Sequence, residues 1–268
     1  MLSKKALISA EATASASGWD ISNAVVDTSF NDGFSNPHAL SFKGDGSKMY
    51  VLNFGNSRIL EYNLSVGWDI STASYSQDFT ISSQDINPFG FFFKPDGTAF
   101  YVTVGTQDRV LQYNLSTAWD ISSASYVDYF SVESYERNPR GVFFKLDGTK
   151  MYILGNTNNK VNEFNLSTAW DITTASYSAG KHVSSQDTFS SGIYFRDDGL
   201  KFYFTGSTND RVYEYNLSTA WSIATASFLQ SFYVGTQETT PRGLFFESDG
   251  QKMYICGVDQ DRVWSYDL

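Results

Sequence analysis

Short alternations of apolar and polar residues recur along the chain in blocks of similar pattern. In residues 160–166, successive side chains fall on opposite sides, with Phe164 and Leu166 on one side and Glu163 and Asn165 on the other. This alternation is typical of a β-strand, and no helical periodicity accompanies it. The same block predicts four antiparallel strands, separated by polar turns, over residues 141–144, 150–154, 160–166 and about 176–183.

The block recurs five times at a fixed spacing. Asp-Gly pairs begin every 51 residues, at Asp45, Asp96, Asp147, Asp198 and Asp249. Four tryptophans keep the same step of 51 residues: Trp68, Trp119, Trp170 and Trp221. A fifth, Trp19, precedes Trp68 by 49 residues. A repeat of about 50 residues that holds four strands is typical of a β-propeller blade. The sequence therefore predicts an all-β fold, a five-bladed β-propeller.

The two ends of the repeat region complement each other. The last copy stops at Leu268, before the connection that follows this point in other copies, and residues 17–21 supply the missing Ser-Gly-Trp-Asp-Ile. We expect a strand from about residue 24 to 30 to complete the last blade and close the ring, since an open array would expose strand edges. Residues 18–268 are then the propeller, and residues 1–17 an N-terminal arm.

Composition narrows the class of protein further. The chain has 22 Phe, 17 Tyr and 6 Trp residues, which favours strands, and a net charge of −10, which disfavours nucleic-acid binding. One cysteine, Cys256, excludes a disulfide framework. No apolar run is long enough to span a bilayer, and we expect no membrane insertion and no secretory leader.

The repeat resembles those of a known group of proteins. The pattern Phe-Phe-Lys-x-Asp-Gly-Thr-Lys-Met-Tyr, followed by Tyr-Asn-Leu-Ser-Thr-Ala-Trp-Asp-Ile, resembles a tandem propeller repeat of bacterial and bacteriophage proteins, including marine phage structural proteins. It covers about residues 19–268. The resemblance implies a propeller and a virion role, although propellers host many functions.

Positions shared by all copies are expected to serve the scaffold. The Asp-Gly pairs are predicted hairpin turns, and the Trp-Asp pairs are predicted to pack blades together. One cation per copy follows the second turn, and one acid in four copies precedes the first strand. We expect these two groups to form ion pairs: Arg58, Arg109, Lys160, Arg211 and Arg262 with Asp85, Glu136, Asp187 and Glu238.

The copies differ at one predicted face, where the first strand begins and the second turn lies. This divergence reflects either drift or a specialised contact surface. Its candidate ligand or partner contacts are His38, Phe54, Asn87, Phe89, Tyr135, Arg137, Arg140, Asn156, Phe189, Ser191 and Arg242. Aromatic and arginine side chains often dominate binding energy.

Catalytic signatures are absent from the sequence. It has no nucleophile elbow, zinc-protease motif or phosphate loop, and two histidines are too few for a usual histidine metal site. We therefore expect no enzyme activity, no catalytic residues, no metal and no cofactor. The leading hypothesis is a bacteriophage virion structural protein: a decoration, collar or fibre-associated module located on the particle.

The expected partners are other virion proteins, bound through the arm and one propeller face, and a host-surface glycan or protein. Two alternatives remain open. One is a carbohydrate-binding lectin with sites between blades. The other is a glycoside hydrolase that uses the acids at the starts of the first strands.

Overall fold

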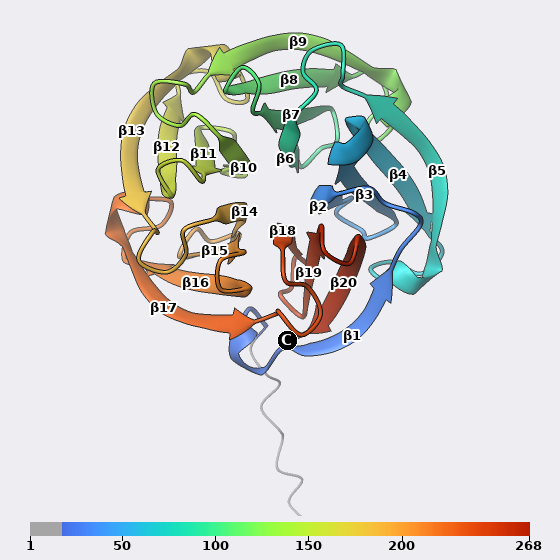
Figure 1. Cartoon of the computed structure of the whole chain (residues 1–268). Helices are drawn as coiled ribbons and strands as arrows, with labels where there is room; N and C mark the ends of the chain where they lie inside the picture. The colour runs from blue at the N-terminus through green and yellow to red at the C-terminus, as the bar shows by residue number, and fades with distance from the viewer. Residues whose placement is uncertain (1–17) are drawn as a thin grey trace, which may run out of the picture.

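A computed structural model describes residues 18–268 as a closed ring of five four-stranded sheets. Figure 1 shows the sheets arranged like blades around a central axis. The predicted all-β, five-bladed propeller is therefore confirmed. The predicted arm, residues 1–17, lies outside the described residues.

Each blade runs outward from the axis through four antiparallel strands. The innermost strands are β2 (Pro37–Phe42), β6 (Pro88–Phe93), β10 (Pro139–Phe144), β14 (Ser190–Phe195) and β18 (Pro241–Phe246). The second strands are β3 (Lys48–Asn53), β7 (Ala99–Val104), β11 (Lys150–Gly155), β15 (Lys201–Gly206) and β19 (Lys252–Gly257). The third strands are β4 (Arg58–Leu64), β8 (Arg109–Leu115), β12 (Lys160–Leu166), β16 (Arg211–Leu217) and β20 (Arg262–Asp267).

The outer strands are β5 (Ala73–Thr80), β9 (Ala124–Ser131), β13 (Ala175–His182), β17 (Ala226–Tyr233) and β1 (Val25–Phe30). Short 3-10 turns, which the alternation pattern did not predict, occupy the connections. They are η1 (Ile21–Asn23), η2 (Phe54–Asn56), η3 (Ile70–Thr72), η4 (Ile121–Ser123), η5 (Ile172–Thr174) and η6 (Ile223–Thr225). We number the blades 1 to 5 by their innermost strands, which are β2, β6, β10, β14 and β18 in that order.

Blade 5 is built from both ends of the described chain. Strand β1 pairs antiparallel with β20, with Val26 opposite Tyr266 and Phe30 opposite Val263. Figure 1 shows this blue strand lying outside the red strands β18–β20. The predicted closure is confirmed, and each of the five sheets has its full set of four strands.

A repeated bond ties each blade to the next. The Tyr101 hydroxyl on β7 donates to the Trp170 carbonyl at 2.7 Å, and the same bond recurs at the other four blade junctions. The tryptophan has a positive φ in every copy, and its ring lies against the glycine of an Asp-Gly turn. These glycines also have positive φ, which residues with side chains rarely adopt. The predicted scaffold roles of the Asp-Gly and Trp-Asp pairs are confirmed.

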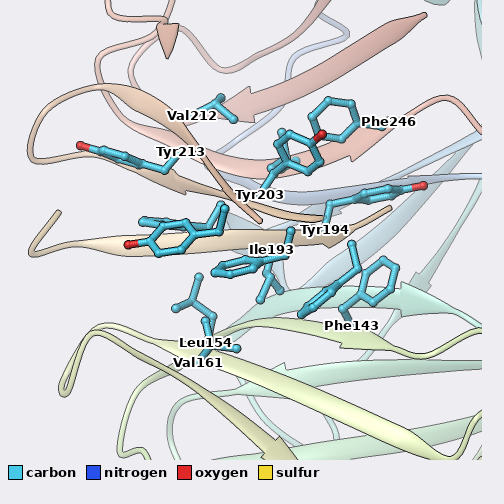
Figure 2. Packing of buried hydrophobic residues seen from close by; sticks show 14 of the residues in the cluster. Phe143, Leu154, Val161, Ile193, Tyr194, Tyr203, Val212, Tyr213 and Phe246 are labelled. Carbon is cyan, nitrogen blue, oxygen red and sulfur yellow. The ribbon is translucent and has the colours of Figure 1, made fainter. Parts of the chain in front are cut away.

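Large aromatic and aliphatic side chains fill the space between blades. Figure 2 shows Phe143, Ile193, Tyr194, Tyr203 and Phe246 packed together across neighbouring blades. Tyr203 is fully buried, and its ring centroid lies 4.5 Å from that of Phe246. This interior holds the innermost strands in fixed positions around the axis, which in turn fixes the side chains at the two ends of the axis.

Candidate functional site

One residue near the start of each innermost strand contributes to a ring at one end of the axis. In blade 1, Pro37 pairs with Asn53 and Ala39 pairs with Leu52, so His38 between them has no partner across the ladder. Bulges of this kind bend a strand and re-aim a side chain. The five equivalent residues are His38, Phe89, Arg140, Ser191 and Arg242. We call this end of the axis the mouth.

Aromatic rings and cations alternate at the mouth. The His38 ring stacks on Phe54 and Phe89, with centroid distances of 4.6 and 5.4 Å. The Arg140 guanidinium lies 3.7 Å from the centroid of Phe89 and 5.2 Å from that of Phe189. The Arg242 guanidinium also lies near the Phe189 ring, 4.3 Å from its centroid, so the two arginines share this ring. Stacking on aromatic faces holds guanidinium groups in place without neutralising them.

Neither guanidinium at the mouth forms a salt bridge among the described residues, although the nearby carboxylates of Glu136 and Glu238 favour the charged forms of Arg140 and Arg242. No salt bridge reaches Arg140 or Arg242, and their Nε atoms are buried without a hydrogen-bond partner. Arg242 Nη1 donates to Ser207 Oγ at 3.0 Å. Burial, together with the neighbouring Arg242, lowers the pKa of Arg140 to about 10, so both guanidinium groups remain charged at neutral pH.

His38 presents the opposite case, because it stays neutral. Burial is the main cause, and the positive charges of Arg242 and Arg140 add to it, lowering the pKa of His38 to about 3. Its Nδ1 atom is buried and lacks a hydrogen-bond partner. The mouth therefore combines two cations with a neutral imidazole, all with unused bonding capacity. An anion with acceptor oxygens fits this arrangement.

The repeated acids near the mouth hold loops and do not pair with the repeated cations. Glu136 accepts bonds from the backbone N–H groups of Asn138, Thr157 and Asn158, and Asp187 and Glu238 accept equivalent sets. Asp85 accepts the N–H of Asn87. Backbone donors replace the expected cations, because the acids lie beneath the second turn and the cations lie farther out along the third strands.

The predicted ion pairs are therefore wrong for this surface. Arg58 pairs with Asp78 on the outer strand, and Arg109 lies over Tyr129 at 3.8 Å from the ring centroid. Lys160 donates to Tyr177 Oη at 2.9 Å. The acids also cannot form the free pair that a glycoside hydrolase requires, since each is bonded to backbone.

The structure brings together six of the predicted contact residues: His38, Phe54, Phe89, Arg140, Phe189 and Arg242. Ser191 belongs to the same ring of positions and is buried. Asn87 bonds Thr106 beside the mouth, Asn156 is half-buried in the second turn of blade 3, and Arg137 is exposed. The Tyr135 ring stacks on that of Tyr177 on the outer strand β13, with 4.8 Å between the ring centroids. The role of these residues as ligand or partner contacts stays a prediction.

Ser207 is the mouth residue that the prediction left out. It orients Arg242, and it occupies the same second-turn position as Phe54 in blade 1 and Asn156 in blade 3. The variability of that position was the available signal.

Apolar side chains close the axis beneath the mouth. Directly beneath His38 and Arg140 the axis holds a cavity of only about 20 Å³. A ring of apolar residues lines this cavity on the side away from the mouth. That ring consists of Leu40, Phe91, Val142, Ile193 and Leu244. Among residues 18–268, no cluster of His, Cys, Asp and Glu fits a metal ion, and no helix is long and apolar enough to cross a membrane.

Solved structures with the same fold are distant in sequence. A Desulfotomaculum acetoxidans protein of unknown function shares 11% identity at a TM-score of 0.58, covering 89% of this chain and 84% of its own. A Bacteroides uniformis protein described as a candidate 6-phosphogluconolactonase shares 16% identity at a TM-score of 0.54, covering 86% of this chain and 66% of its own. A Lactobacillus plantarum protein shares 16% identity at a TM-score of 0.53, covering 86% of this chain and 67% of its own. This chain thus spans about two thirds of the length of the last two. No curated protein matches its sequence.

A family profile gives the stronger result. The family described as lactonase, 7-bladed β-propeller, matches residues 84–268, which is more than half of the chain. This match overturns the expectations of a non-enzymatic protein and of a bacteriophage virion component, and it lends no support to the lectin alternative. The expected virion partners and location rested on that interpretation, and nothing in the fold tests them. With five blades in the described residues, the chain belongs to the lactonase family of β-propellers.

Proposed function

We propose that the protein hydrolyses a lactone that carries a phosphate or carboxylate group, and that the reaction takes place at the mouth. The observation that carries this proposal is the convergence of two unpaired guanidinium groups on a neutral histidine, in a chain of net charge −10. Two guanidinium groups that form no salt bridge are suited to binding an anionic group of a substrate.

Each group has a part in the proposed reaction. One guanidinium, from Arg140 or Arg242, binds the anionic substituent, and the other faces the lactone carbonyl oxygen. Water attacks the carbonyl carbon while the His38 imidazole takes its proton through Nε2, since Nδ1 is buried. The tetrahedral intermediate then breaks the ring carbon–oxygen bond, and His38 returns the proton to the leaving oxygen. The product is an open-chain hydroxy acid.

Several facts support this assignment. Family membership points to lactone hydrolysis, and the candidate 6-phosphogluconolactonase of similar fold suggests a phosphorylated sugar lactone. The negative charge of a bound substrate would also raise the pKa of His38 from its value in the free protein. A stronger base would therefore be available only when substrate is present.

The test is hydrolysis of 6-phosphogluconolactone and of uncharged gluconolactone, each measured above the rate of spontaneous opening. We expect a kcat/KM at least tenfold higher for the phosphorylated lactone. Arg140→Ala and Arg242→Ala should each lower it by about 10–100-fold, the usual worth of a charge-assisted hydrogen bond. His38→Gln should lower kcat by about 100-fold or more, with a smaller change in KM.

Lys145→Ala is the matched control, because it removes one positive charge at an Asp-Gly turn, away from the mouth. It should leave both rates unchanged. Equal losses in the control and the arginine variants, or hydrolysis no faster than in buffer for both lactones, would contradict the proposal.

A further inference from the structure

The other end of the axis, beyond the apolar ring of Leu40, holds a second layer of side chains. The next position in each innermost strand is aromatic in four blades: Phe92, Phe143, Tyr194 and Phe245. The ring centroids of successive members lie 5.0, 5.2 and 5.3 Å apart, each in an edge-to-face arrangement. Figure 2 shows two members of this layer, Phe143 and Tyr194, on neighbouring strands.

Blade 1 interrupts this aromatic layer. Its equivalent residue is Ser41, and among the described residues no ring contact joins Phe245 to Phe92 across the gap. Ser41 is only 6% exposed, so the gap is not simply open surface. The surrounding frame is kept, because the next residue, Phe42, is a phenylalanine in all five blades.

A cavity of about 170 Å³ lies at this place. Ser41, Phe92 and Phe245 line it, together with Phe42 and the two tryptophans that flank blade 1, Trp68 and Trp119. The pocket is partly open to solvent, since the half-exposed Leu146 is among its lining residues. An engineered apolar cavity of about 150 Å³ in another protein is large enough to bind benzene. The present cavity therefore has the volume and the lining for one aromatic ring.

We propose that this cavity binds a small molecule through a single aromatic ring, which takes the fifth place in the aromatic layer. Edges and faces of Phe92 and Phe245 are available to it in the geometry that their own neighbours already use. The ring of five apolar residues that includes Leu40 lies between this cavity and the mouth. Its side chains line this cavity on one side and the small cavity beneath His38 and Arg140 on the other. The inference is therefore independent of the proposed lactone hydrolysis.

Fluorobenzene is a suitable probe, and its ¹⁹F resonance can be followed as protein is added. We expect saturable binding with a dissociation constant on the order of 0.1–1 mM. Ser41→Phe supplies the missing ring from the chain itself and should weaken binding at least tenfold while raising the melting temperature. Ser41→Ala keeps the cavity and should bind within about twofold of the unchanged protein.

Ser41→Leu serves where the phenylalanine variant does not fold, and it should weaken binding by a smaller factor in the same direction. Arg140→Ala, at the mouth, should bind the probe normally. Undiminished binding by both filled variants, or no saturable binding by the unchanged protein up to 5 mM probe, would overturn the proposal. An aliphatic probe of similar size, such as fluorocyclohexane, should bind several-fold more weakly, and equal binding would remove the preference for an aromatic ring.

Discussion

His38 shares the mouth with two guanidinium groups, and this neighbourhood links folding stability to pH. The imidazole stays neutral in the folded protein down to about pH 3, whereas in the unfolded chain it takes up a proton near pH 6.5. Below pH 6.5 the unfolded chain therefore binds one more proton than the folded protein. Stability falls with decreasing pH over this window and is unaffected above it.

We expect His38 to cost about 2 kcal/mol of unfolding free energy between pH 7 and pH 5. The check is urea unfolding of the unchanged protein and of His38→Gln at both pH values. Other groups titrate equally in both proteins, so the difference between their losses isolates His38. Parallel losses in the two proteins would mean that the folded imidazole is protonated at pH 5.

A second effect at the residue scale comes from an ion pair that blades 1, 3 and 4 share and blade 2 lacks; in blade 5, Ser265 replaces the glutamate and Lys252 pairs with Asp27 and Asp267. In blade 1, Lys48 Nζ lies 2.6 Å from Glu61 Oε1, and blades 3 and 4 have the equivalent pair. Blade 2 has Ala99 and Gln112 at these positions. A groove of about 650 Å³ opens there, and Asp128 and Asp171 line it beside them.

We expect Ala99→Lys and Gln112→Glu to be strongly coupled. Gln112→Glu alone should destabilise the protein, because it adds a half-buried carboxylate near Asp128 and Asp171, while the lysine of this groove, Lys94, already pairs with Asp96. The double variant should recover this loss, with a coupling energy of about 1–3 kcal/mol in denaturant midpoints at constant slope. The matching cycle in blade 1, Lys48→Ala with Glu61→Gln, should give a similar value, and additive effects in blade 2 would contradict this account.

At the scale of elements, the 51-residue period predicted the strands and their order well. The turns at Asp96-Gly97 and the alternation at 160–166 depend on local backbone and side-chain chemistry, which one copy already reveals and five copies confirm. The bond from Tyr101 to the Trp170 carbonyl was not predictable, since it joins residues of different blades and needs the positive φ of the tryptophan.

The site was predictable only as a set of variable positions. Divergence between copies marked His38, Arg140 and Arg242, and the bulge in each first strand then brings them to one axis. Sequence spacing does not show which groups lack partners after folding. It therefore missed the unpaired charge, and with it the reason to expect an enzyme. Nor does it show that the Tyr135 ring stacks on Tyr177 of the outer strand β13.

For the whole molecule, stability depends on the strand that closes blade 5. Strand β1 covers β20, Phe30 packs edge-to-face on Tyr62 of blade 1, and the Trp19 carbonyl accepts the Tyr203 hydroxyl of blade 4. The segment that contains them therefore joins three blades at once.

Removing residues 2–30 should lower the free energy of unfolding by about 5 kcal/mol or more, through lost strand pairing and exposed apolar surface. Removing residues 2–17 leaves every described contact in place and serves as the control, with a melting temperature close to that of the full chain. Equal melting temperatures for the two truncated proteins would show that the ring does not depend on β1.

The offset between repeat and blade also bears on how such rings change size. A 51-residue unit, counted from one Asp-Gly turn to the next, contains parts of two sheets, and the strand that seals the circle comes from outside the last unit. Duplicating or deleting one whole unit would therefore add or remove one sheet while the sealing pair of β1 and β20 stayed intact. Duplication or deletion of single units in the gene thus offers a simple route between a five-bladed ring and the seven blades named in the family description. Every intermediate would keep the strand pair that closes the ring.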